Sequence, residues 1–242
     1  MKKEIHKWYS PSLNKDMEVA VYGHYGTPLL MFPTAGADFL EYERFQLIDS
    51  IQPVIDKGKF KAFSINSINN ESWLNNSIYP PHKSLRHGQY NQYVIEEVVP
   101  FIFNNCGGQI PIITTGASLG AYHAANTFLR TPSIFRGTIA MSGLYSLKSY
   151  TKGYYDDHVY FNSPVDYLAN VTDNTYLNQI RDNLGIVIAS GQGEFEDPSG
   201  SVELSNILNS IGVMHWLDLW GHDVKHDWPT WRDMLPYFLG KF

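Results

Sequence analysis

The sequence lacks several features that mark other classes of protein. It contains a single cysteine, Cys106, so no disulfide can form within the chain and nothing points to an oxidising compartment. No stretch approaches the roughly 18 uninterrupted apolar residues of a membrane-spanning helix. The N-terminal segment is positively charged, but the apolar stretch of a signal peptide does not follow it. We therefore expect a cytoplasmic protein that does not contact a membrane.

Positive charge is also scarce. The 18 lysines and arginines are outnumbered by 24 aspartates and glutamates, which gives a formal net charge of -6 at pH 7. No basic run could neutralise a row of phosphates, so nucleic acid is not an expected partner. Hydrophobic residues make up 43% of the 242 residues and charged residues 17%, an ordinary globular composition. At this length we expect one domain that spans residues 1–242.

The sequence does contain an alternation of predicted strands and helices. Strands are predicted at 6–9, 17–22, 28–32, 60–65, 110–113, 137–142, 184–189 and 213–219. Helices are predicted at 39–55, at 85–104 with a kink near Pro100, at 121–129, at 201–210 and after Pro229. A polar loop at 66–83 and a tyrosine-rich irregular stretch at 144–163 complete the pattern. This order predicts an α/β class three-layer sandwich, with a mostly parallel sheet and an antiparallel N-terminal edge.

The segment Gly116-Ala117-Ser118-Leu119-Gly120 lies between a predicted strand and a predicted helix. A Gly-x-Ser-x-Gly turn in that position is typical of the nucleophile elbow of serine hydrolases, which holds the serine above the edge of the sheet. Glycine at both flanks removes the β-carbons that would collide where the chain reverses. The alternative is an ordinary strand-to-helix turn in which Ser118 only caps the helix.

A serine hydroxyl is a poor nucleophile at neutral pH, so an elbow needs an acid and then a histidine later in the chain. Two segments that follow predicted strands, 190–197 and 221–228, supply both. The candidate acids and bases in them are Glu194, Glu196, Asp197, His222 and His226. Both segments leave the carboxyl ends of strands, the edge at which open α/β sheets bind ligands.

The most specific segments are 116–126 around Ser118, 191–196 with Phe195 before Glu196, and 226–231, which begins with His226. Together they resemble the serine esterases of the α/β-hydrolase superfamily that are related to esterase D, enterochelin esterase and the mycolyltransferases. The resemblance implies the α/β-hydrolase fold and a triad of Ser118, Glu196 and His226. Many relatives carry aspartate as the acid, and its position in the loop varies among them, so Glu194 and Asp197 stay open.

The two histidines allow a second interpretation. His222 and His226 are four residues apart, a spacing that on a helix would place both imidazoles on one face as metal ligands. Gly221 and Pro229 flank the pair and indicate a loop, and Asp223 stands where a zinc peptidase needs a glutamate. We therefore expect no metal and no cofactor, and we favour His226 over His222 as the general base.

Acyl transfer also requires hydrogen-bond donors for the developing oxyanion. One is expected to be the amide of Leu119, directly after the nucleophile. The second is expected from the loop after the third strand, which faces the elbow in the family's arrangement. Ala35 is the first choice there, with Thr34 and Gly36 as alternatives. His123, one helical turn beyond the nucleophile, is expected to be a structural residue hydrogen-bonded to the sheet.

These residues predict a serine carboxylesterase that hydrolyses a small-molecule ester through an acyl-enzyme. By analogy, the ester would carry a short acyl group on a polar or sugar-like alcohol. Two alternatives use the same residues. An acyltransferase would pass the acyl group to an alcohol instead of water, and a non-catalytic binding protein would keep the fold with an inactive site.

Overall fold

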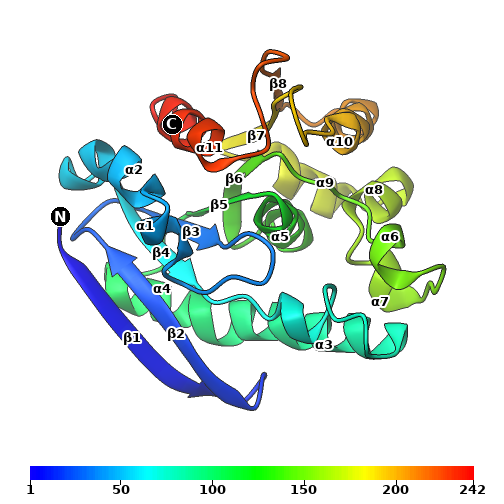
Figure 1. The fold of residues 1–242 in the computed structure, drawn as a ribbon, viewed down its shortest axis with the longest axis horizontal. Coiled ribbons are helices and arrows are strands. Elements are labelled where there is room, and N and C mark those ends of the chain that lie inside the picture. The colour runs from blue at the N-terminus through cyan, green and yellow to red at the C-terminus, as the bar shows by residue number, and fades with distance from the viewer.

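The computed structural model describes all 242 residues and contains one eight-stranded sheet. The strands lie in the order β1-β2-β4-β3-β5-β6-β7-β8 (Figure 1). Only the pairs β1 with β2 and β2 with β4 are antiparallel; all other neighbours are parallel. The bounds are β1 (Lys3–Ser10), β2 (Lys15–Tyr22), β3 (Thr27–Phe32), β4 (Phe60–Ile65), β5 (Ile112–Ala117), β6 (Phe135–Met141), β7 (Gly185–Ser190) and β8 (Trp216–Leu219). The predicted α/β class and antiparallel N-terminal edge are thus confirmed.

Helices cover both faces of the sheet (Figure 1). The helices are α1 (Glu41–Arg44), α2 (Leu47–Asp56), α3 (Pro80–Tyr93), α4 (Val99–Cys106), α5 (Leu119–Arg130), α6 (Lys148–Thr151), α7 (Asp157–Tyr160), α8 (Pro164–Tyr167), α9 (Asn174–Arg181), α10 (Ser199–Ser210) and α11 (Trp228–Leu239). Apolar side chains of α2 and α11 form one core with the sheet. Those of α3, α4, α5, α8 and α10 form a second core on the other face. None of the helices is both long and apolar enough to cross a membrane.

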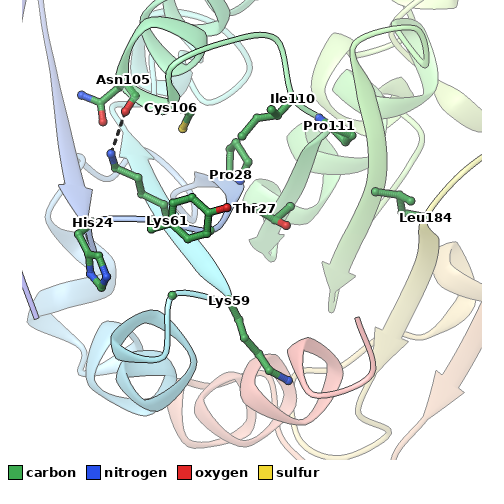
Figure 2. Close-up of a pocket in the computed structure, with 13 residues that line it drawn as sticks. His24, Thr27, Pro28, Lys59, Lys61, Asn105, Cys106, Ile110, Pro111 and Leu184 are labelled. Carbon is green, nitrogen blue, oxygen red and sulfur yellow. Dashed lines mark hydrogen bonds between the residues drawn. The ribbon is translucent and has the colours of Figure 1, made fainter.

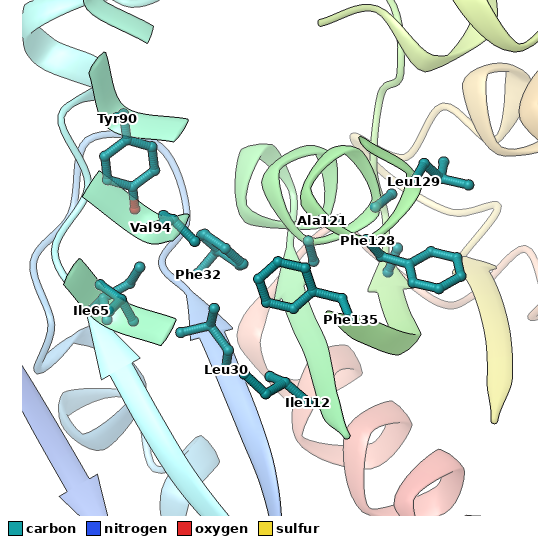
Figure 3. Packing of buried hydrophobic residues seen from close by; sticks show 14 of the residues in the cluster. Leu30, Phe32, Ile65, Tyr90, Val94, Ile112, Ala121, Phe128, Leu129 and Phe135 are labelled. Carbon is teal, nitrogen blue, oxygen red and sulfur yellow. The ribbon is translucent and has the colours of Figure 1, made fainter. Parts of the chain in front are cut away.

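The central strands supply side chains to both cores because successive residues of a strand point to opposite faces. In β3, Leu29 lies in the core beneath α2 and α11, and Leu30 lies in the core beneath α5. In β5, Ile113 lies in the core beneath α2 and α11, and Ile112 lies in the core beneath α5. Figure 3 shows Leu30 and Ile112 in one cluster with Ala121 of α5, with the ring of Phe135 between them and Ala121. This two-sided burial holds the carboxyl ends of β3 and β5, and the loops that leave them, in fixed positions.

Two predicted helices were wrong in detail. The helix predicted at 39–55 is divided into α1 and α2, because Gln46 adopts a left-handed conformation with φ 63°. The helix predicted at 85–104 begins earlier, at Pro80, a residue suited to the first turn of a helix. It then passes through a π-helical turn at Val94–Val98 before α4. Pro100 is the second residue of α4, a position in the first helical turn where a proline is tolerated.

Other differences lie in the connections. The predicted polar loop at 66–83 contains a 3-10 turn at Asn69–Glu71. The stretch predicted as irregular at 144–163 contains the short helices α6 and α7, and α9 had not been predicted. These elements are one or two turns long, so they carry little hydrophobic periodicity in the sequence.

Candidate active site

Ser118 lies at the turn between β5 and α5 with φ 56° and ψ -124°, a sparsely populated conformation for a residue with a side chain. Its side chain makes no capping hydrogen bond to α5, so the alternative of a simple helix cap does not describe it. A β-carbon on Gly116 would lie 2.3 Å from the carbonyl of Gly120. A β-carbon on Gly120 would lie 2.3 Å from the carbonyl oxygen of Phe32. Both glycines are therefore required, and the second brings the end of β3 against the elbow.

Three of the candidate amides, those of Leu119, Ala35 and Gly36, have no acceptor within the protein. Leu119 is the first residue of α5, so its amide has no partner within the helix, and no other group of the protein accepts its proton. The amide of Ala35, in the loop after β3, also lacks a partner. The amide of Thr34 is bound to a carboxylate oxygen of Glu41 at 2.8 Å, which removes Thr34 as a candidate donor.

The structure joins one of the candidate acids to one of the candidate bases. His226 Nδ1 lies 3.1 Å from Glu196 Oε2. Because a carboxylate only accepts, the hydrogen-bond network assigns the proton to Nδ1 and leaves Nε2 free to accept.

The other candidates have different partners or none. Glu194 forms an ion pair with Lys225 at 2.8 Å, and both side chains are exposed. Asp197 is exposed and accepts from the amide of Ser199 at 3.0 Å. His222 is exposed and makes no side-chain hydrogen bond, and no group of three or more His, Cys, Asp or Glu side chains is arranged as a metal site.

Glu196 occupies a site that favours its ionised form. Only 1% of its side chain is exposed. Its Oε1 accepts from Ser142 Oγ at 2.5 Å and from the Gly191 amide at 3.2 Å. Burial alone would raise the pKa of Glu196, but hydrogen bonds from His226, Ser142 and Gly191 outweigh burial and hold the pKa below its usual value. The carboxylate therefore remains charged next to the imidazole.

Sequence reasoning missed the residues that support this acid. Ser142 follows β6 with φ 54° and accepts a hydrogen bond from Trp231 Nε1 at 3.0 Å, while its hydroxyl donates to Glu196. The ring of Trp231 also packs edge-on against His226, with centroids 5.1 Å apart. Ser142 could have been found as a small polar residue that ends a predicted strand at the edge where Ser118 lies. Trp231 lies in the segment 226–231 that carries the resemblance, but nothing in the sequence marked it as a partner of Ser142.

Ser118, Glu196 and His226 line one cavity of about 710 Å³ at the carboxyl ends of the strands. No hydrogen bond joins Ser118 Oγ to His226 Nε2 in this cavity. Most of the residues that line it are polar, and its one lysine, Lys148, is paired with Asp166 at 2.9 Å. The remaining lining residues are Ser142, Gly143, Leu144, Tyr145, Ser146, Ser149, Phe195, Asp197, Ser199, Gly200 and Glu203.

A second cavity, of about 440 Å³, lies at the opposite, amino ends of the strands. Figure 2 shows that the side chains of His24 and Lys59 point away from that of Lys61, so the three do not converge. Lys61 Nζ donates to the backbone oxygen of Asn105 at 3.0 Å. Burial raises the pKa of the Cys106 thiol, which disfavours the reactive thiolate. This cavity therefore has no arrangement comparable with that around Ser118.

Comparisons with known proteins identify a family and a fold. A model of the family described as "Putative esterase" matches residues 10–239. Among solved structures the chain is similar to a ferulic acid esterase, with 19% identity and a TM-score of 0.76 over 98% of this chain and 95% of that one. For an S-formylglutathione hydrolase from Agrobacterium tumefaciens the identity is 13% and the TM-score 0.73, over 99% and 93% of the two chains. For MPT51 from Mycobacterium tuberculosis the values are 16% and 0.70, over 100% and 97%. No curated protein matches significantly. At these identities the structural likeness shows the fold, which is that of the α/β-hydrolases.

Proposed function

The chain belongs to the "Putative esterase" family of α/β-hydrolases, and we propose that it is a serine carboxylesterase. In this proposal Ser118 is the nucleophile, His226 the general base and Glu196 the triad acid. The observation that carries the proposal is the pairing of His226 Nδ1 with a buried carboxylate in the same cavity as a strained serine at a strand-to-helix turn.

Acylation begins when Ser118 Oγ attacks the ester carbonyl carbon and His226 Nε2 takes the hydroxyl proton. The carbonyl oxygen becomes an oxyanion and accepts hydrogen bonds from the amides of Leu119 and Ala35. The carbon–oxygen bond to the alcohol then breaks, and the imidazolium returns its proton to the departing alcohol oxygen. Glu196 stabilises the imidazolium throughout without taking its proton. Each oxyanion donor is worth roughly 3 kcal/mol of barrier reduction.

Deacylation repeats the same steps with water. His226 Nε2 removes a proton from the water as its oxygen attacks the acyl carbon, and the same two amides hold the second oxyanion. The bond between the acyl carbon and Ser118 Oγ then breaks. The proton passes from the imidazolium to Ser118, which restores the free enzyme and releases the carboxylic acid.

The cavity lining supports a polar alcohol portion in the substrate. The hydroxyl groups of Ser146, Ser149 and Ser199 line the cavity and can hydrogen-bond to hydroxyl groups of a bound alcohol. The carboxylates of Glu196, Asp197 and Glu203 line the same cavity as its one lysine, so the excess of negative charge disfavours an anionic substrate. We therefore propose a short acyl group on a neutral, polar alcohol as the substrate class.

The direct test is labelling with a fluorophosphonate probe at neutral pH. We expect covalent modification of Ser118 in the wild type and none in Ser118→Ala. A series of p-nitrophenyl esters of increasing acyl length should show turnover that depends on Ser118 and declines for long acyl groups. Absence of labelling in a folded protein would contradict the proposal. When glycerol is added as an acceptor, formation of a glycerol ester at the expense of free acid would instead identify an acyltransferase.

A further inference from the structure

The loop that presents the Ala35 amide is held by side chains from the distant 3-10 turn at Asn69–Glu71. Asn69 Nδ2 donates a hydrogen bond to the carbonyl oxygen of Ala35. Asn70 Nδ2 donates to the next carbonyl, that of Gly36, at 3.1 Å. Ala35 has φ 40°, in the left-handed region that residues with a β-carbon avoid, so external contacts must stabilise its conformation.

These contacts determine where the Ala35 amide points. The carbonyl oxygen of Thr34 accepts from the amide of Ala37 at 3.1 Å. Because the two ends of a trans peptide point in opposite directions, the N–H of Ala35 points away from that bond. Asn69 fixes the following peptide through the Ala35 oxygen, and Glu41 fixes the preceding one through the Thr34 amide. The free N–H therefore belongs to a peptide that is held on both sides.

Asn69 is itself oriented by His123. Asn69 is fully buried and His123 is 2% exposed, and His123 Nε2 lies 2.9 Å from Asn69 Oδ1. The Ala35 oxygen can only accept, so it places the amide nitrogen of Asn69 on its own side, and Oδ1 then faces a donating Nε2–H. Burial lowers the pKa of His123 to about 3, so the ring is neutral with its single proton on Nε2. The expected bond from His123 to the sheet was thus wrong.

The contacts form a continuous path from the nucleophile to the oxyanion loop. His123 lies on α5, five residues after Ser118, and its ring stacks on Phe32, the last residue of β3, with centroids 5.9 Å apart. Its N–H reaches Asn69, and Asn69 reaches Ala35. We propose that Asn69 is a positioning residue that preorganises the oxyanion hole, and that His123 orients it. This inference rests on the proposed esterase function.

The test compares Asn69→Asp with Asn75→Asp. The first keeps the size of the side chain but replaces the N–H donor with an oxygen that faces the Ala35 carbonyl. The second changes a residue whose hydrogen bond stays within its own loop. For p-nitrophenyl acetate we expect Asn69→Asp to lower kcat about 10²- to 10³-fold, as for the loss of one oxyanion donor, with KM changed less than about threefold. Asn75→Asp should match the wild type.

A second pair of variants tests the role of His123. It also keeps the inference testable if Asn69→Asp does not fold. His123→Gln keeps an N–H donor close to the position of Nε2, whereas His123→Phe keeps a ring and removes the donor. We expect His123→Gln to retain kcat within about fivefold and His123→Phe to lose it at least about 50-fold. A trifluoromethyl ketone inhibitor forms a tetrahedral adduct that places an oxyanion in the oxyanion hole. Its affinity for each Asn69 and His123 variant should fall in parallel with the kcat/KM of that variant.

The outcomes separate this inference from the proposed function. If the wild type is active through Ser118 but a folded Asn69→Asp variant keeps its kcat, the positioning role is wrong. If both His123 variants melt at lower temperature with equal and unchanged kcat, the contacts are only structural and the inference is also wrong. If the wild type is not labelled at Ser118, the esterase proposal itself fails.

Discussion

Replacing Glu196 with glutamine should lower kcat about 10³- to 10⁴-fold without unfolding the protein. Glutamine keeps the size of the side chain, and its oxygen can still accept from Ser142 and the Gly191 amide. Its amide nitrogen would then face His226 Nδ1, where only an acceptor fits. The imidazole would carry its proton on Nε2 and could no longer take the proton of Ser118.

The distance between the two groups gives an independent magnitude. With Glu196 Oε2 3.1 Å from His226 Nδ1, opposite unit charges attract by about 5 kcal/mol at an effective dielectric constant of about 20. That attraction exists only while the imidazole is protonated, so its loss raises the barrier rather than weakening substrate binding. About 5 kcal/mol corresponds to a rate factor near 10⁴. Because 26% of the His226 side chain is exposed, solvent screening reduces this value, and the lower bound of 10³ takes that into account.

Steady-state hydrolysis of p-nitrophenyl acetate measures this effect, and urea unfolding checks that the variant remains folded. Glu194→Gln is a matched control, because Glu194 is an exposed carboxylate of the same loop that pairs with Lys225 and does not line the cavity. It should keep kcat within about twofold. The reasoning is refuted if a folded Glu196→Gln variant keeps more than about one tenth of the wild-type kcat, or if Glu194→Gln loses most of it.

Three further predictions concern stability. Gly120→Ala should lower the free energy of unfolding in urea by about 1–3 kcal/mol and abolish ester hydrolysis, because its β-carbon would lie 2.3 Å from the Phe32 carbonyl oxygen; wild-type activity would contradict this. Burial lowers the pKa values of His87 and His123, so their stabilising contribution is complete above about pH 6.5 and declines as the pH falls. Urea unfolding at pH 7.5 and 5.0 should show that the free energy of unfolding falls by up to about 1.4 kcal/mol per pH unit for each histidine. In His123→Gln this fall should be smaller by the contribution of one histidine. An equal pH dependence of stability in the wild type and in His123→Gln would oppose the assignment. At Phe195, which is 83% exposed with φ 63°, glycine should be more stable to thermal unfolding than alanine by up to about 1 kcal/mol, the reverse of the order at an ordinary position.

The sequence predicted the sheet because apolar alternation and turn residues are local signals. It also placed Ser118 at a strand-to-helix turn, since the two flanking glycines mark a close backbone approach that needs no knowledge of the partner. The resemblance, and not the residue pattern, favoured Glu196 over its neighbours. Which carboxylate reaches the histidine depends on the path of the loop, where the Gly193 amide donates to the Val224 oxygen at 2.8 Å. Such pairing between two loops leaves no periodic trace in either one.

The support around the site was beyond sequence reasoning for a related reason. Asn69 lies 34 residues from Ala35 and 54 from His123, within a segment predicted as a polar loop. An asparagine in such a segment is usually a solvated turn residue. Only the packing of the 3-10 turn beneath the oxyanion loop makes Asn69 a buried residue with a partner on each side of its amide.

Backbone strain gives the site a physical mark that does not depend on similarity to other proteins. Of the seven non-glycine residues with positive φ, Ser118, Ser142 and Phe195 line the cavity, and Ala35 lies in the loop after β3. They follow β3, β5, β6 and β7, so each strained residue begins or shapes a loop at the carboxyl edge of the sheet. At about 1 kcal/mol or more apiece, their combined cost is a large part of the 5–15 kcal/mol that typically stabilises a folded protein. The two-sided burial of the central strands offsets this cost. Since alanine, serine and phenylalanine do not favour positive φ, the sequence could not predict these strained conformations. The contacts that hold these strained loops keep Ser118 and Glu196 at one cavity, and in our proposal they also orient the Ala35 amide.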